Sequence, residues 1–217
     1  MTNPASWVRR IPVYLSGLFL MTAGVNLSVL SGLGVSPIDT IPYVVSLISG
    51  KSLGLCTTLV FSVYIALQIV ILRRDFQWHN LFQLVISTIF GWFVTLSGQL
   101  TALLPAEPGY LVQLLYMLCS IAFLGTGIFL YVAADILNMP ADAVALALSF
   151  RTGRPMSTTK IWFDWTVVAV SVALSLGFLG GVNGIREGTL VAAFGVGLCI
   201  RFWERRLTEP LRRFLFP

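Results

Sequence analysis

The chain alternates long apolar stretches with short polar segments, and six of the stretches approach the length that crosses a lipid bilayer. A transmembrane helix needs about 20 predominantly apolar residues. Helices are expected because lipid offers no hydrogen-bond partners to an exposed backbone, and the stretches are too long for barrel strands. The six predicted spans are Ile11–Ser31, Leu53–Leu72, Leu81–Leu104, Leu111–Ala134, Ile161–Leu179 and Gly188–Trp203.

The composition narrows the class of protein further. Of 217 residues, 57% are hydrophobic and 11% are charged, whereas a soluble domain carries about 25% charged residues. Such a chain has too few charged residues to cover a water-facing surface, which excludes a soluble enzyme or a nucleic-acid-binding protein. The expected partner is therefore the lipid bilayer and not nucleic acid. No cleavable signal peptide is expected, because the apolar run after Arg9 and Arg10 continues for a full crossing.

The distribution of basic residues predicts an orientation. If the N-terminus is inside, the inner segments hold 12 of the 14 Lys and Arg residues, and the outer segments hold only Lys51 and Arg186. Positive charge collects on the cytoplasmic side of membrane proteins. We therefore expect a multi-pass protein of the cell (inner) membrane with both termini in the cytoplasm. The basic tail, residues 205–217, is expected to lie in the membrane interface, with a partner-docking role as the alternative.

Two loops of the chain share a pattern that predicts an internal repeat. Each carries Pro-x-Asp, then Ser, then Gly followed by a basic residue. At a constant offset of 103 the pattern pairs Pro37 with Pro140, Asp39 with Asp142, Ser46 with Ser149, Gly50 with Gly153 and Lys51 with Arg154. The halves, about 9–104 and 111–204, hold three spans each, so the second enters the membrane inverted. The predicted fold is an all-α membrane protein, one transmembrane domain (1–217) of six helices in a 3+3 inverted repeat.

Each repeated loop also predicts a short helix that is too short to span. These helices, Ile38–Ser49 and Ala141–Thr152, are expected to be broken or interfacial, with Pro at the start and Gly at the end. Ser36 and Asp39 fit a capping box. The N-terminus of a helix that follows a break in the preceding helix attracts anions. An aspartate already lies at the N-terminus of each short helix and would repel an anion, so the alternative is that the two helices only cap the bundle. The predicted gating residues are Gly34, Ser36, Pro37, Asp39, Asn138, Pro140 and Asp142.

Polar side chains inside the spans are candidates for a substrate or ion pathway. Asp164 lies one helical turn from Lys160, so the two residues form either part of a pathway or a structural ion pair at the inner boundary. The predicted pathway residues are Asp164, Asp135, Asn26, Gln68, Gln83 and Lys160. Arg186, Glu187 and Thr189 are expected at an outer entrance, although Glu187 also suits a helix start.

Catalytic and metal-binding patterns are weak. The single histidine, His79, is expected in an inner loop, so no catalytic site, no metal site, no cofactor and no enzymatic activity are predicted. Cys56, Cys119 and Cys199 form no C-x-x-C pair and are expected to pack in the core. Small residues (Gly91, Gly195, Gly197) permit close helix packing or a homodimer.

The first repeated loop, Gly32-Leu33-Gly34-Val35-Ser36-Pro37-Ile38-Asp39, and the pair Gly188-Thr189 resemble the YczE-like (YitT-related) family of integral membrane proteins. The resemblance covers essentially the whole chain, including the second Pro-x-Asp. It departs where the family tends to place glycines and this chain has Asp135, Leu137 and Asn138. The resemblance implies a multi-pass topology and no particular chemistry.

Together these patterns predict a transporter of a small solute or ion, with a pathway between the inverted halves. A carboxylate in that pathway can couple transport to protons. The alternative is a non-transporting accessory protein that stabilises or localises a membrane partner.

Overall fold

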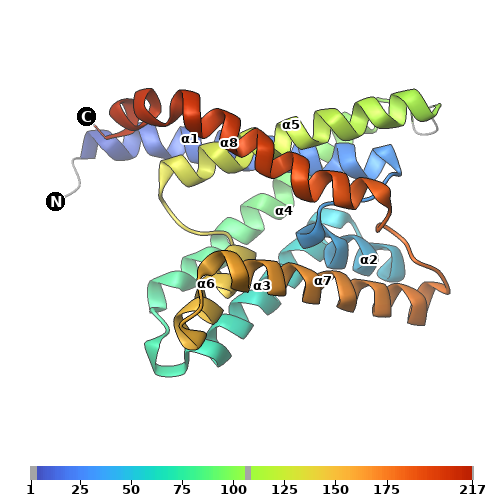
Figure 1. Ribbon diagram of the computed structural model, residues 1–217, viewed down its shortest axis with the longest axis horizontal. Coiled ribbons are helices and arrows are strands. Elements are labelled where there is room, and N and C mark those ends of the chain that lie inside the picture. The colour runs from blue at the N-terminus through green and yellow to red at the C-terminus, as the bar shows by residue number, and fades with distance from the viewer. Residues whose placement is uncertain (1–3, 106–108, 217) are drawn as a thin grey trace. The chain divides into compact units, whose positions relative to one another are not determined.

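The structure, a computed structural model, describes residues 4–105 and 109–216 (Figure 1). Long apolar stretches form helices because a helix satisfies its own backbone hydrogen bonds. The helices in chain order are α1 (Pro4–Ser31), η1 (Pro37–Asp39), α2 (Thr40–Ser49), α3 (Leu53–Leu72), η2 (Arg73–Asp75), η3 (Trp78–Leu81), α4 (Phe82–Thr101), α5 (Tyr110–Ala134), α6 (Pro140–Thr152), α7 (Met156–Leu179) and α8 (Glu187–Leu215).

Five helices in the described residues are long and apolar enough to cross a membrane. They are Ser6–Ser31, Leu53–Asp75, Trp78–Thr101, Tyr110–Ala134 and Thr158–Leu179, and they coincide with the first five predicted spans. The predicted sixth span, Gly188–Trp203, is not among them. It lies in α8, where Arg201 and Glu204 shorten the uncharged stretch below about 20 residues. The expected separate tail is instead the continuation of α8 to Leu215.

The two predicted short helices are present as α2 with its preceding turn η1, and as α6. Pro140 is the first residue of α6 and Pro37 the first of η1. Gly50 and Gly153 end the two helices in the left-handed conformation, each with φ of 66°. The predicted capping box is wrong, because neither Ser36 nor Asp39 makes a side-chain capping hydrogen bond.

The chain forms two compact units, and each takes segments from both halves of the sequence. Unit 1 comprises Met1–Gly34, Leu96–Ile136 and Glu187–Pro217. Unit 2 comprises Val35–Thr95 and Leu137–Arg186. Of the four points along the chain where one unit gives way to the other, the one between Thr95 and Leu96 falls within α4.

In unit 1, α1 and α5 run antiparallel and in contact along most of their length (Figure 1). Glycines permit this approach. A Cβ atom added at Gly17 would lie 2.8 Å from the carbonyl oxygen of Gly127, and one added at Gly127 would lie 2.6 Å from that of Gly17. Tyr14 packs its ring edgewise on Tyr131 at 6.2 Å between centroids.

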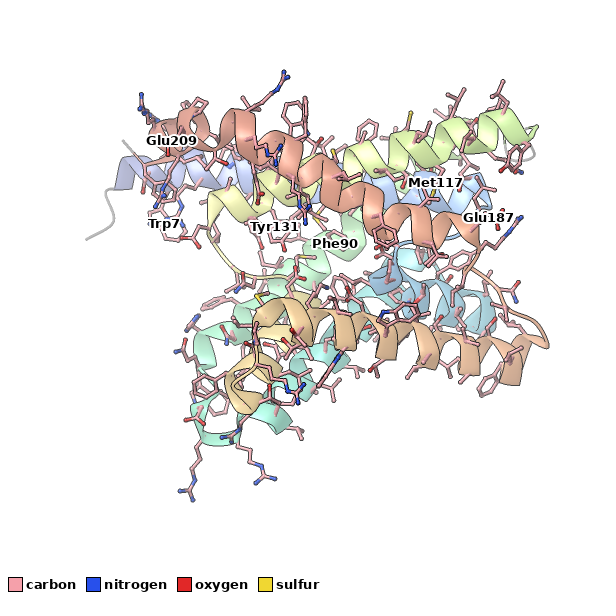
Figure 2. The ribbon with its side chains drawn as sticks, viewed as in Figure 1. Trp7, Phe90, Met117, Tyr131, Glu187 and Glu209 are labelled. Carbon is pink, nitrogen blue, oxygen red and sulfur yellow. The ribbon has the colours of Figure 1, made fainter. Side chains whose placement is uncertain are left out.

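Helix α8 lies along α5 and runs in the same direction. Ala192 packs in a buried cluster with Met117. Further along both helices, the indole Nε1 of Trp203 donates to the Thr126 hydroxyl at 2.8 Å. Figure 2 shows Met117 and Glu187 toward one end of unit 1, and Trp7 and Glu209 at the end near the termini.

The two ends of the described chain meet in unit 1 around a buried arginine. Arg10, only 4% exposed, donates from Nε to the Ala134 carbonyl at 2.8 Å and from a second nitrogen to the Asp135 carbonyl. This places a positive charge at the C-terminal end of α5, where the helix dipole favours it. The guanidinium of Arg10 also lies 4.8 Å from the ring centroids of Trp7 and Phe216.

Unit 2 is built on the packing of α3 against α4 and α6. Gly54 and Gly91 face each other across α3 and α4, and each leaves no space for a Cβ atom. The Phe61 and Phe90 rings stack nearby at 5.6 Å. Arg151, near the end of α6, donates to the carbonyls of Ile71 and Leu72, at 2.9 Å for Ile71. These bonds join the C-terminal ends of α6 and α3.

An apolar stripe covers the outer face of α3. Its exposed members recur at intervals of three or four residues: Leu55, Leu59, Val63, Leu67 and Val70. Such spacing puts them on one face of the helix. An outward apolar face of this kind is suited to lipid, in agreement with the composition.

Candidate functional site: a charged cluster in unit 2

A lysine held by two carboxylates is the main charged feature of unit 2. The Lys160 ammonium lies 2.9 Å from an Asp164 carboxylate oxygen and 3.1 Å from an Asp142 carboxylate oxygen. The three side chains are 24–27% exposed, so the charges are largely withdrawn from solvent. Exposed ion pairs contribute little to stability, whereas charges inside an apolar helix bundle need their partners.

Three local features of the sequence position these groups. Pro140 starts α6 and thereby puts Asp142 in the first turn, where the helix dipole favours a carboxylate. Lys160 and Asp164 lie one turn apart on α7, so their side chains share one face. The Thr159 hydroxyl donates to the Ala145 carbonyl at 3.0 Å and joins α7 to α6 beside the cluster.

Asp39 joins the same cluster from the first repeated loop. It ends η1, lies outside the five candidate spans, and is only 7% exposed. Burial raises the pKa of the Asp39 carboxyl to about 7, and the nearby ammonium of Lys160 opposes that rise. Asp39 and Asp142 hold equivalent positions in the two loops, and both act on one lysine.

Tyr64 contributes a buried hydroxyl without a partner. Its side chain is 4% exposed, and its hydroxyl oxygen makes no hydrogen bond in the described structure. The group interacts electrostatically with both Asp39 and Asp164. Its ring packs edgewise against Phe163 at 5.3 Å, which fixes it between α3 and α7. A buried hydroxyl usually has a partner, so this one is available to a ligand, a water molecule or a proton-bearing carboxyl.

Two predicted pathway residues, Gln68 and Gln83, form a pair in the same unit. Each is 1% exposed. Gln68 Nε2 donates to Gln83 Oε1 at 2.9 Å, and Gln83 Nε2 donates back to Gln68 Oε1 at 3.3 Å. Gln68 also donates to the Pro140 carbonyl at 3.2 Å. The pair therefore joins α3 and α4 to the start of α6, two residues before Asp142.

The other two predicted pathway residues lie in unit 1 and not in this cluster. Asn26 donates to the Ser97 hydroxyl at 2.8 Å and to the Thr22 carbonyl at 3.1 Å. Asp135 is exposed and ends α5 in the left-handed conformation, with φ of 47°. It stands 103 positions after Gly32, which has φ of 66°. Aspartate tolerates this conformation, so the second loop turns at the same point as the first without a glycine.

The predicted gate and entrance residues differ in their backbone conformation and in their exposure to solvent. Gly34 has φ of 118°, which confirms a break after α1. Asn138 is exposed, as are Arg186 and Glu187, while Thr189 is 4% exposed. Glu187 opens α8, the position expected of a residue that stabilises a helix start.

The cysteine prediction is only partly correct. Cys56 is buried, Cys199 is half-buried against Gly125, and Cys119 is exposed on α5. An apolar helix in lipid can present a cysteine outward at little cost. Gly91 and Gly195 do pack closely against neighbouring helices, but Gly197 has open space around it.

Sequence reasoning did not identify Tyr64 or the convergence of Asp39 and Asp142 on Lys160. These contacts join helices that are distant along the chain, and spacing within one helix does not reveal them. The equivalence of Asp39 and Asp142 in the repeat was the available signal. In the described residues, no group of three or more His, Cys, Asp or Glu side chains is arranged to hold a metal ion.

Comparisons with known proteins agree with a membrane protein of this kind. A protein family described as a family of unknown function (DUF6198) matches residues 8–205. The chain is 23% identical over 196 residues to the "Uncharacterized membrane protein YczE" of Bacillus subtilis (strain 168), which covers 90% of this chain and 85% of that protein. No solved structure matches the chain. The chain therefore belongs to the DUF6198 family of YczE-like membrane proteins.

Proposed function

We propose that this membrane protein transports a small solute or ion, and that Lys160 with its carboxylates forms part of the transport site. The observation that carries the proposal is the ionic cluster itself. Asp164 and Lys160 lie in a helix apolar enough to span the bilayer. Ionisable groups are costly in such helices and mark pathways for substrates, ions or protons.

We further propose that the fold is a six-span inverted repeat, as in many secondary transporters. Equivalent positions have equivalent backbone geometry: Gly50 and Gly153 both have φ of 66°. The contact of α1 with α5 is also reciprocal. Gly17 approaches Gly127, and Gly24 approaches Ser120. At the offset of 103, Gly17 is equivalent to Ser120 and Gly24 is equivalent to Gly127, so the two contacts are related by exchange of the two halves. Reciprocal contacts are expected when two equivalent helices pack about a two-fold axis.

The sixth span of this proposal is the first part of α8. Ala192, Gly195 and Cys199 lie beside Met117, Ile121 and Gly125 of α5 in the same order. Helix α5 is a candidate span. A helix that follows α5 in this order passes through the same depth of the bilayer as α5.

Cytoplasmic termini complete the proposed topology. Phe216 packs on Arg10, which puts both ends of the described chain at one end of unit 1. That arrangement supports an even number of crossings. The excess of basic residues on the predicted inner segments supports the cytoplasmic side.

Transport is tested with the purified full-length protein reconstituted in liposomes. A panel of small cations, anions and neutral solutes is applied, and solute-induced currents are recorded on a solid-supported membrane. We expect currents from at least one solute class with the wild type and their loss in Asp164→Asn. Asp75→Asn is the matched control, because Asp75 is 49% exposed and pairs with Arg151 at 3.4 Å, outside the cluster.

Two results contradict the proposal. Wild-type currents in Asp164→Asn remove the assigned role of that carboxylate. Because electroneutral transport carries no current, uptake of each radiolabelled solute into the same liposomes is measured as well, and the absence of both current and uptake contradicts transport itself and favours an accessory role beside a partner protein.

A further inference from the structure

The cluster around Lys160 carries more negative than positive charge. Asp142 and Asp164 both contact the ammonium, and Asp39 adds a third carboxylate in its field. With all groups ionised, three negative charges face one positive charge. Burying an excess of like charge is unfavourable unless a cation or a proton neutralises it.

Among the three carboxyls, Asp39 has the setting best suited to carry a proton. Asp142 and Asp164 each form an ion pair with the Lys160 ammonium, at 3.1 Å and 2.9 Å. Asp39 is the most buried of the three and interacts with that ammonium only at longer range. Burial without a direct counter-ion favours the neutral acid.

The unpaired hydroxyl of Tyr64 is an independent sign that the cluster receives something. It interacts with Asp39 from η1 and with Asp164 from α7 while it bonds to neither. A phenol oxygen accepts a hydrogen bond from a neutral carboxylic acid, and its hydrogen is donated to an ionised one. Tyr64 therefore suits either state of a carboxyl that gains and loses a proton.

We propose that Asp39, with the Tyr64 hydroxyl beside it and Lys160 as its fixed counter-charge, is a reversible proton-binding site. A hydronium ion from the solvent transfers a proton to a carboxylate oxygen of Asp39: one O–H bond of hydronium breaks, one O–H bond of the acid forms, a water molecule is left, and the excess negative charge of the cluster falls by one. The groups that interact with Asp39 are Lys160 from α7 and the Tyr64 hydroxyl from α3. If the protein is a transporter, the proton bound at this site is its coupling ion, and this part of the inference rests on the proposed function.

Infrared difference spectroscopy of the full-length protein measures this site without any transport. Spectra are recorded as pH is raised through neutrality, in water and in deuterium oxide, to detect the C=O stretch of a protonated carboxylic acid. We expect such a band in the wild type at low pH and its loss with a midpoint of about 7, the value to which burial raises the Asp39 pKa. The band should be absent in Asp39→Asn and present in the exposed control Asp75→Asn.

Two further variants keep the test decisive if Asp39→Asn does not fold. Tyr64→Phe should keep the band and shift its frequency, because the neutral acid loses a polar hydroxyl from its surroundings. Lys160→Met should raise the midpoint by about 1 pH unit or more, since an opposite charge no longer favours the ionised form. A band that persists in Asp39→Asn, or an unchanged frequency in Tyr64→Phe together with an unchanged midpoint in Lys160→Met, overturns the proposal.

The infrared and transport experiments fail separately. If the band titrates as expected and no solute produces a current or is taken up, the proton site stands and the transport function falls. If currents are present and the band does not depend on Asp39, transport stands and the proton site falls.

Discussion

Lys160 interacts with three aspartates from three different elements of unit 2. Two of them, Asp142 and Asp164, are in direct contact with its ammonium, while Asp39 acts at longer range. The lysine thus links α6, α7 and the first repeated loop through one charge. Removing an ion from such a group leaves its partners uncompensated in a poorly solvated place.

Lys160→Met should therefore destabilise the protein, by up to about 3 kcal/mol. Two partly buried carboxylates lose their counter-ion, and the apolar replacement offers them no hydrogen bond. Thermal unfolding in detergent, compared with that of the wild type, measures the effect. The double variant Lys160→Met/Asp164→Asn should recover part of the loss because one unpaired charge is gone. A single variant as stable as the wild type would mean that the cluster is already neutral or fully hydrated.

At the scale of helices, close contact of α1 with α5 is the main organising feature of unit 1. Both helices place a glycine where the other backbone passes, and Gly24 provides a second such point beside Ser120. Lipid gives little hydrophobic drive for helices to associate, so close packing at small residues matters more than in water.

Gly17→Ala and Gly127→Ala test this contact. A Cβ atom at either position would lie within 2.8 Å of a backbone oxygen of the opposite helix, so the helices must move apart. We expect each variant to lose about 1–3 kcal/mol of stability. Gly197→Ala is the matched control, because its added Cβ meets nothing within 4 Å and alanine favours a helix. Equal thermal stability of all three variants would contradict the described packing.

Most of the helices were predictable from the sequence because apolar length and Pro or Gly punctuation act locally. The boundaries of α3 and the ends of both short helices follow directly from such signals. The continuation of α8 past the predicted span does not follow from such signals. A run of charged residues ends an apolar stretch, yet Glu204, Arg205 and Arg206 are good helix formers and the helix continues through them. The Lys160–Asp164 pair was readable from its spacing. Asp39 and Tyr64 were not, because their approach depends on tertiary packing.

At the scale of the whole molecule, the charge distribution and the repeat lead to the same topology by separate arguments. The basic residues predict cytoplasmic termini. The proposed repeat predicts that equivalent loops lie on opposite sides of the membrane, since each half is proposed to hold three spans. Lys51 and Arg154 occupy equivalent positions directly after the glycines that end α2 and α6, and both are exposed.

The sidedness of these two positions is the most direct test of the inverted architecture. Cys56, Cys119 and Cys199 are replaced by serine, and Lys51→Cys and Arg154→Cys are introduced one at a time. Intact cells are then treated with an impermeant thiol reagent, with permeabilised cells as the control for reactivity. The inverted repeat predicts labelling at position 51 in intact cells and at position 154 only after permeabilisation. Labelling of both positions in intact cells, or of neither until the cells are permeabilised, would place the two loops on the same side and contradict the inverted repeat.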